Sequence, residues 1–239
     1  MLKRLFFAIV ILTTAQSFSQ PYLALHAGYG LSAASEVINT KSIDNGHQNV
    51  YGTLGSGLHF GGAIGFMMHE NFGLELGLTY TKGSSMDGNY KSSGRTYDQK
   101  VYGNYLGIAP SVIVQTKADN VRPYAKFGFV LALPGATEEQ STYSGTQKGE
   151  YSGGMALGYT GAAGLNLGTD RMQLFIELAL TSLSWAPAKV KYSDASGHSI
   201  EYDLKDEDPA PSSNPTSVRL SQTIPFSNIA LNVGIKVGF

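Results

Sequence analysis

Apolar and polar residues alternate with a period of two along eight segments of this chain, and residues 226–239 show the pattern most clearly. Every second position from Ile229 to Phe239 carries a large apolar side chain, while Ala, Asn, Gly and one lysine, Lys236, occupy the positions between. Successive side chains of a β-strand point to opposite faces, so this alternation predicts a strand. The eight predicted strands cover residues 22–31, 57–67, 72–81, 102–115, 122–133, 151–167, 171–181 and 226–239.

The two faces of these strands differ in the same way throughout the chain. One face carries large aliphatic and aromatic side chains, and the other carries mostly Gly, Ala, Thr and Asn. This division suits a sheet that has lipid on its outside and a narrow, filled interior. The pattern therefore predicts an all-β fold, an eight-stranded antiparallel up-and-down transmembrane β-barrel.

The lengths of the connections support this topology. Short connections follow the second, fourth and sixth predicted strands, and long polar connections follow the first, third, fifth and seventh. Outer-membrane barrels sort their connections in this way, with short periplasmic turns and long extracellular loops. In the longest connection, residues 187–223, the segments KVKYS and HSIEYDL flank DASG, which predicts a polar hairpin projecting from the barrel. Ten strands are the alternative, if that hairpin joins the ring.

Two features interrupt the alternation. Pro110 lies on the apolar face of the fourth predicted strand, where a proline usually marks an edge or a bulge. The parity slips near residues 182–185, where we expect a bulge or the membrane surface. Aromatic residues near the strand ends predict two interfacial girdles. Their members are Phe66, Phe72 and Phe239 at one end and Tyr29, Tyr80 and Trp185 at the other.

Four charged residues lie inside the predicted strands, and all four are on the small-residue face: Glu75, Lys126, Glu177 and Lys236. A lysine that faces lipid costs about 2–4 kcal/mol, whereas one in the lumen can be paired. We expect Glu75 to meet Lys126 across the lumen and Glu177 to pair with Lys236. Because side chains just fill an eight-stranded barrel, this lumen charge network is predicted to plug the interior; a proton or ion path is the alternative.

Composition agrees with a membrane barrel. Charged residues make up 15% of the chain, against about 25% in an average soluble protein. The formal net charge of −1 argues against a nucleic-acid partner. The chain has no cysteine, which excludes disulfides, thiol catalysis and cysteine-based zinc sites.

The first residues predict a secretory signal peptide. Lys3 and Arg4 precede the apolar run 5–12, and small residues follow, with cleavage expected near Ser19. We therefore divide the chain into a signal peptide, residues 1–19, and an outer-membrane β-barrel, residues 20–239. No later run approaches the ~18 apolar residues of a transmembrane helix.

The terminal segment NVGIKVGF, together with YLGIAPSVIV and VRPYAKFGF, resembles the outer-membrane β-barrel domain family of Gram-negative bacteria. That family includes the OmpA transmembrane domain and the OmpX, Ail and opacity-protein group, and the resemblance covers roughly residues 21–239. It implies location in the outer membrane, contact with outer-membrane lipid and lipopolysaccharide, and recognition of Phe239 by the barrel-assembly machinery. Because the shared features are patterns more than fixed residues, the resemblance is specific for architecture and weak for function.

Other polar residues suggest little chemistry. His26 and His59 face the lumen, but we expect them to lie far apart in ordinary hydrogen bonds. An acidic group in the last long connection (Asp203, Asp206, Glu207 and Asp208) matches no defined calcium loop. Ser196, His198, Ser199 and Glu201 share one hairpin, which would not hold catalytic groups rigidly. We therefore predict no catalytic residue, no metal site, no cofactor and no enzyme.

These observations predict an outer-membrane protein with a plugged lumen and long extracellular loops, in a structural or surface-binding role. Loop tyrosines and flexible polar residues suit a surface ligand. A small pore and a lipid A-modifying enzyme are the alternatives.

Overall fold

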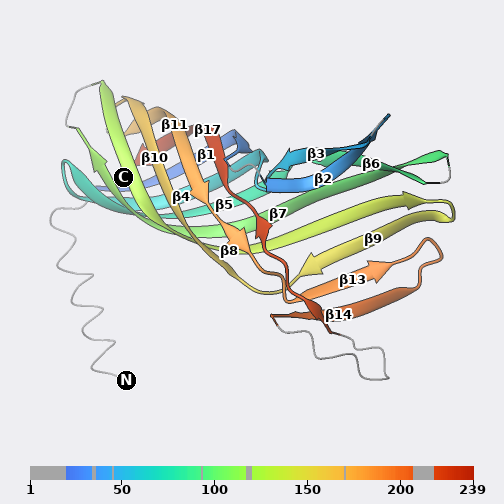
Figure 1. Cartoon of the computed structure of the whole chain (residues 1–239). Helices are drawn as coiled ribbons and strands as arrows, with labels where there is room; N and C mark the ends of the chain where they lie inside the picture. The colour runs from blue at the N-terminus through green and yellow to red at the C-terminus, as the bar shows by residue number, and fades with distance from the viewer. Residues whose placement is uncertain are drawn as a thin grey trace, which may run out of the picture.

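The computed structural model of the chain describes residues 20–33, 36–44, 46–92, 94–116, 120–169, 171–206 and 218–239. Eight antiparallel strands close into a ring in the order β1, β4, β5, β7, β8, β10, β11, β17, and β17 pairs back onto β1 (Figure 1). The predicted eight-stranded barrel is therefore confirmed. The strand bounds are β1 Gln20–Ser32, β4 Gly57–His69, β5 Phe72–Gly83, β7 Arg95–Gln115, β8 Val121–Thr142, β10 Ala156–Gly168, β11 Met172–Ser182 and β17 Asn228–Gly238.

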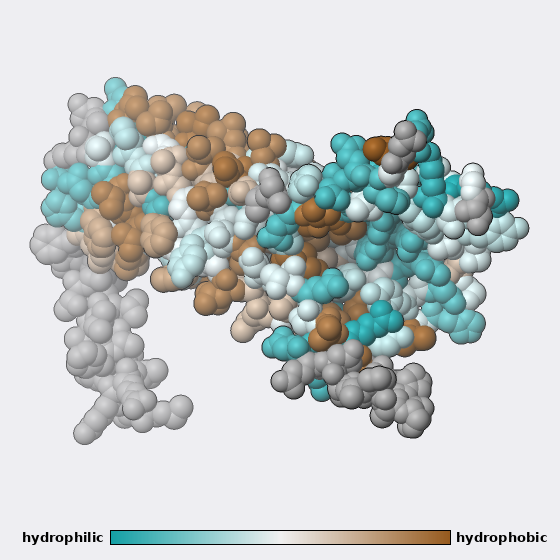
Figure 2. Space-filling model, in the orientation of Figure 1, coloured by the Kyte–Doolittle hydropathy of each residue, from teal (hydrophilic) through white to brown (hydrophobic). Residues whose placement is uncertain are grey.

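The predicted apolar series points outward around the whole ring. Leu25, Leu76, Leu178 and Leu231 are each between 51% and 57% exposed, although they belong to different strands. Brown apolar residues accordingly cover much of the barrel surface in Figure 2. An exposed apolar surface of this extent marks a membrane or protein contact, and a continuous belt around a closed barrel fits lipid.

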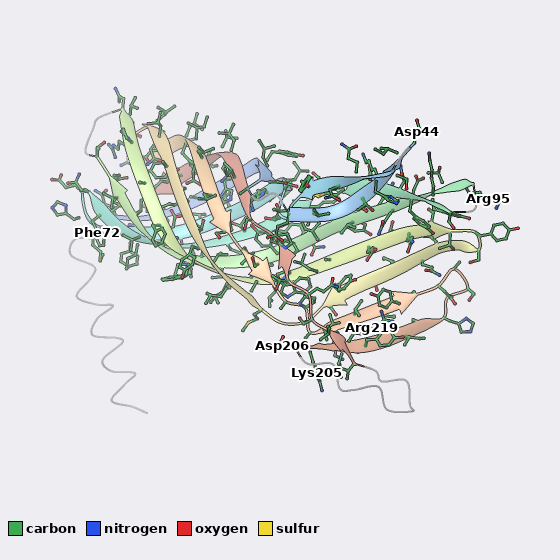
Figure 3. The ribbon with its side chains drawn as sticks, in the orientation of Figure 1. Asp44, Phe72, Arg95, Lys205, Asp206 and Arg219 are labelled. Carbon is green, nitrogen blue, oxygen red and sulfur yellow. The ribbon has the colours of Figure 1, made fainter. Side chains whose placement is uncertain are left out.

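The two kinds of connection lie at opposite ends of the barrel, as predicted. The turns after β4, β7 and β10 share one end with the C-terminus, which we call the short-turn end (Figure 1). Phe72 marks this end in Figure 3. The connections after β1, β5, β8 and β11 lie at the other, the long-loop end.

Strands β7 and β8 are 21 and 22 residues long and continue past the ring at the long-loop end. On one side β6 (Met86–Ser92), β2 (Glu36–Ile43) and β3 (Gly46–Gly52) extend them into a second sheet region. On the other side β9 (Gly145–Ser152), β13 (Lys189–Ser193), β14 (Ser199–Lys205) and β15 (Val218–Leu220) do the same. We call this region the outer sheet; Figure 1 shows it as a curved extension of the barrel wall.

The outer sheet decides between eight and ten strands. The predicted hairpin forms as β13 and β14, and β13 pairs with β9 in the outer sheet. Since neither strand belongs to the ring, the ten-strand alternative is wrong.

Parts of the predicted loops are strands. Residues 36–43, 46–52, 86–92 and 145–149 pair in the outer sheet, although sequence alone predicts polar loops there. Both faces of this sheet carry polar residues, so the strands lack the apolar alternation by which a half-buried strand is recognised. Their stability comes from backbone ladders that start on β7 and β8.

Two predicted details of the strands are wrong. The sixth predicted strand, 151–167, is divided because Gly153 and Gly154 have φ values of 76° and 75°, which end β9 before β10 begins. Pro110 causes neither an edge nor a bulge. Ile108 pairs with Leu131 and Ser111 with Gly128, so the register is the same on both sides of the proline.

The predicted signal peptide, residues 1–19, lies outside the described residues. Within the part of the chain that the structure describes, no helix is long and apolar enough to cross a membrane.

Candidate functional site

Lys126 is the centre of the lumen charge network. Its Nζ lies 3.0 Å from Glu75 Oε1 and 2.8 Å from Glu177 Oε2. One strand lies between β8 and the strand of each glutamate, β7 on the side of Glu75 and β10 on the side of Glu177. Ser111 of β7 separates Glu75 from β8, and Ala162 of β10 pairs directly with Lys126 on the side of Glu177. These small side chains leave the lysine room to reach both carboxylates.

Two tyrosines complete the hydrogen bonding of the glutamates in the same way. Tyr22 donates to Glu75 Oε2 at 2.8 Å, and Tyr124 donates to Glu177 Oε2 at 2.9 Å. Each tyrosine ring lies over a glycine of the strand that separates it from its glutamate. This glycine is Gly65 of β4 for Tyr22 and Gly164 of β10 for Tyr124. A Cβ added at either glycine would overlap the tyrosine ring.

Lys236 does not pair with Glu177, contrary to the expectation. It faces Gln173 across the β11–β17 ladder, whereas Glu177 faces Asn232, and Asn232 Nδ2 donates to Glu177 Oε1 at 3.2 Å. Lys236 Nζ instead lies 3.6 Å from the centroid of the Tyr22 ring, a cation–π contact. The four charges therefore form one group with no net formal charge, in which Lys236 acts through a tyrosine.

A cavity of about 70 Å³ lies next to this group inside the lumen. Its lining includes Glu75, Lys126, Glu177, His26 and His59. The expectation that the two histidines lie far apart is wrong. His59 pairs with Gly28 across the β1–β4 ladder, two residues from His26.

Three buried polar atoms that belong to residues of this lining have no hydrogen-bond partner among the described residues: His59 Nε2, Asn228 Oδ1 and Asn232 Oδ1. A polar void of this volume has room for water, which would satisfy them. The lumen is thus polar at this level, with a void of the size that suits water.

An apolar cluster lies in the barrel above the cavity, at the long-loop end. We call it the mouth plug, and its largest fully buried side chains are Leu54, Leu183, Trp185 and Phe226, each at most 1% exposed. The ring of Tyr105 packs edge-on against Phe226, with centroids 5.9 Å apart.

Chain segments outside the ring build the mouth plug. β12 (Ser184–Trp185) pairs with β16 (Ile224–Pro225), and Leu54 N donates to Pro225 O at 2.9 Å. Trp185 is therefore a plug residue and not the girdle residue that its position near a strand end predicts. The parity slip near residues 182–185 is the sequence signal of the inward turn; nothing in the alternation pattern points to Leu54.

The Ser196, His198 and Asp194 side chains lie together, but they form a turn and not a catalytic relay. Ser196 Oγ lies 2.8 Å from His198 Nδ1 and donates to Asp194 Oδ1 at 2.7 Å. Asp194 also accepts the backbone N–H groups of both residues, and the hydrogen bond from Ser196 is the main cause of the lowered pKa of Asp194. Serine and aspartate contact the same ring nitrogen, so no second nitrogen connects them as a relay requires.

The remaining candidates are dispersed. Glu201 pairs with Lys189 at 2.6 Å, and Ser199 is an exposed residue at the start of β14. Asp203 and Asp206 are exposed, while Glu207 and Asp208 lie outside the described residues. No group of three or more His, Asp or Glu residues is placed to hold a metal ion in the described ranges. Phe239 is 78% exposed at the short-turn end.

No known family model matches this chain, and no curated protein matches it in sequence. Among solved structures, the major outer membrane protein of Thermus thermophilus matches with a TM-score of 0.52 and 13% identity, over 92% of this chain and 99% of that chain. Neisserial surface protein A matches with a TM-score of 0.45 and 14% identity, over 92% and 97% of the two chains. The N-terminal β-barrel domain of Pseudomonas aeruginosa OprF matches with a TM-score of 0.39 and 12% identity, over 93% and 98%.

Identities this low are evidence of fold alone, and the match to the Thermus protein, with its TM-score of 0.52, supports the fold. The closed ring, the apolar belt and the sorted connections agree with that match. The chain therefore has the fold of a small outer-membrane β-barrel.

Proposed function

We propose that this protein is an integral outer-membrane barrel that serves as a closed anchor, and that its outer sheet is a binding surface outside the cell. The observation that carries the proposal is the arrangement of two obstructions in series in the lumen. The Lys126 group and the mouth plug both lie across the interior. The sheet region beyond them is built on the two longest strands of the ring.

The apolar belt and Phe239 suggest the other partners. The belt contacts outer-membrane lipid, and the polar outer sheet stands where lipopolysaccharide sugars begin. Phe239, exposed at the short-turn end, is the proposed signal for the barrel-assembly machinery. The predicted signal peptide, residues 1–19, would deliver the chain across the inner membrane.

The two alternatives lack support of this kind. A pore needs a continuous path, and the void beside the Lys126 group measures about 70 Å³. A lipid-modifying enzyme needs a nucleophile and a base in a fixed relation. The Ser196 hairpin does not supply that relation, because the Ser196 hydroxyl donates its hydrogen bond to Asp194 at an exposed turn.

Planar-bilayer conductance of the purified, folded protein tests the closed anchor. We expect no stepwise conductance above that of the bare bilayer, with a large porin reconstituted in parallel as the positive control. Folding is checked beforehand by heat-modifiable gel mobility. Stable, ohmic channel events from the folded protein would replace this proposal with the pore.

A further inference from the structure

The inner face of the outer sheet carries a groove, and we propose that this groove binds a neutral oligosaccharide. The inference rests on the proposed function, because it names the ligand class of the binding surface. Three adjoining cavities of about 490, 260 and 180 Å³ form the groove. The first two share Tyr192 and Arg219, the second and third share Tyr151 and Gln222, and Glu138 lines both the first and the third. Figure 1 shows the outer sheet curving around this side.

The groove floor continues the lumen face of the barrel wall. On β8 the alternation that places Lys126 in the lumen also places Glu138 and Gln140 on the floor. Gln140 pairs with Gln147 across the β8–β9 ladder, and Glu138 pairs with Gly149. The floor is therefore a rigid, regularly paired surface that is open where the lumen is closed.

An aromatic wall borders the floor on the side of β13 and β14. The Tyr192 and Tyr202 rings meet edge-on with centroids 6.0 Å apart, and the Arg219 guanidinium lies 5.2 Å and 4.3 Å from those centroids. Tyr192 rests against Gly149, where an added Cβ would come within 3.1 Å of the ring. Figure 3 shows Arg219 at this border of the sheet. The wall presents ring edges and hydroxyls to the groove.

The formal charges along the largest cavity cancel, and each charged side chain already has a partner within the outer sheet. Its lining holds two acids, Glu138 and Asp194, and two bases, Lys148 and Arg219. Glu138 accepts from Gln99 at 2.6 Å, and Lys148 pairs with Glu150 at 2.8 Å. An anionic ligand would find no cluster of free bases here, so charge complementarity favours a neutral one.

The floor offers hydrogen-bonding groups to a ligand. The side chains of Gln140 and Gln147 are cross-strand neighbours in the lining of the largest cavity, and neither amide has a hydrogen-bond partner among the described residues. A primary amide donates and accepts in one plane, which matches a pair of neighbouring hydroxyls on a sugar ring. Tyrosine hydroxyls along the wall add further donors and acceptors.

A peptide suits this groove less well. Peptides that bind sheets add a strand to a free edge, whereas the floor strands β8, β9 and β13 are each paired on both edges. A sugar chain needs only side-chain groups on a sheet face, and the groove supplies these along its length. The three adjoining cavities together offer space for several sugar rings.

Isothermal titration of the full chain in nanodiscs tests the inference, with maltohexaose, cellohexaose, laminarihexaose and chitohexaose as neutral probes. We expect saturable binding of at least one, unchanged between low salt and 0.5 M NaCl because no ion pair is involved. The double variant Gln140→Ala/Gln147→Ala should weaken it about tenfold or more, as the loss of two hydrogen-bonding groups implies. Ser141→Ala/Thr146→Ala is the matched control, because that pair is adjacent on the same strands and faces the opposite side.

Heparin and an extended peptide library complete the experiment. Binding of heparin alone, lost at 0.5 M NaCl, overturns the neutral-sugar assignment, and so does binding of peptides alone. Absence of binding by every neutral hexasaccharide also overturns it, as does equal binding by both double variants. None of these outcomes bears on the closed anchor, whose failure would appear as conductance.

Discussion

The lumen and the outer sheet share strands β7 and β8 and the same face of each, yet they handle polar groups in opposite ways. In the lumen, Glu177 is 3% exposed and bonds to Lys126, Tyr124 and Asn232. In the groove, the paired amides of Gln140 and Gln147 face open space. The difference is closure: eight strands leave a bore that side chains fill, and once the ring ends the same face opens to solvent. One continuous strand face therefore lines both a crowded interior, where polar groups bond to one another, and an open surface.

Removing the central lumen charge should have the largest effect. Lys126→Met leaves Glu75 and Glu177 buried without their shared cation, and we expect the free energy of unfolding to fall by about 3–5 kcal/mol. Urea unfolding from lipid bilayers, followed by heat-modifiable mobility and by fluorescence of the single tryptophan, Trp185, measures this. A loss below about 1 kcal/mol would mean that the network does not hold the lumen together.

A pair of glycine substitutions sharpens the contrast between closed and open packing. In Gly164→Ala the new methyl group would come within 2.5 Å of the Ile176 carbonyl oxygen and 2.8 Å of the Tyr124 ring. The ladder fixes the carbonyl and the ring cannot move without leaving Glu177, so we expect a loss of about 1–3 kcal/mol. In Gly149→Ala the methyl group meets Tyr192, which borders the groove and can shift. The second variant should remain within about 1 kcal/mol of the parent protein.

The same unfolding measurement compares the two glycine variants. If Gly149→Ala proves as costly as Gly164→Ala, then the outer sheet is packed as tightly as the lumen. Tyr192 would then be unable to shift, contrary to this prediction.

The exposed ion pair of the outer sheet should have the smallest effect. Lys148 Nζ lies 2.8 Å from Glu150 Oε1, and both side chains are more than a third exposed. We expect Lys148→Met to cost less than about 1 kcal/mol, and less still at high salt. The hydrogen bond from Lys148 lowers the pKa of Glu150 below 4.5, so the contribution of the pair is complete above that pH and is lost as the pH falls through the lowered pKa.

Comparison of the Lys148→Met and parent proteins at neutral and acid pH checks this prediction. Their stabilities should differ slightly at neutral pH and converge under acid conditions. A difference that grows as the pH falls would contradict the assigned ion pair.

The alternation of residue types determined the barrel. The side chains of a strand alternate between two faces, and a charge that faces lipid at depth is costly. The sequence therefore predicted which residues form the apolar outer face, which form the small-residue inner face, and that the four charges lie in the lumen. The alternation of short and long connections then predicted the up-and-down topology. The same reasoning failed for the outer sheet, where both faces are polar and residues 36–52 show no alternation that separates a strand from a loop.

Only the tertiary structure decided the partners of each lumen residue. Long connections do not set the register of the strands they join. The hydrogen-bond register of β1 with β4 brings His59 to the same depth as His26, and the register of β1 with β17 brings Lys236 next to Tyr22. Likewise, Leu54, Trp185 and Phe226 form the mouth plug through contacts between segments far apart in the chain. The sequence by itself thus determined which face each residue takes, because that is a local property of a strand. The tertiary structure decided depth and pairing, because those depend on how eight separate strands are aligned.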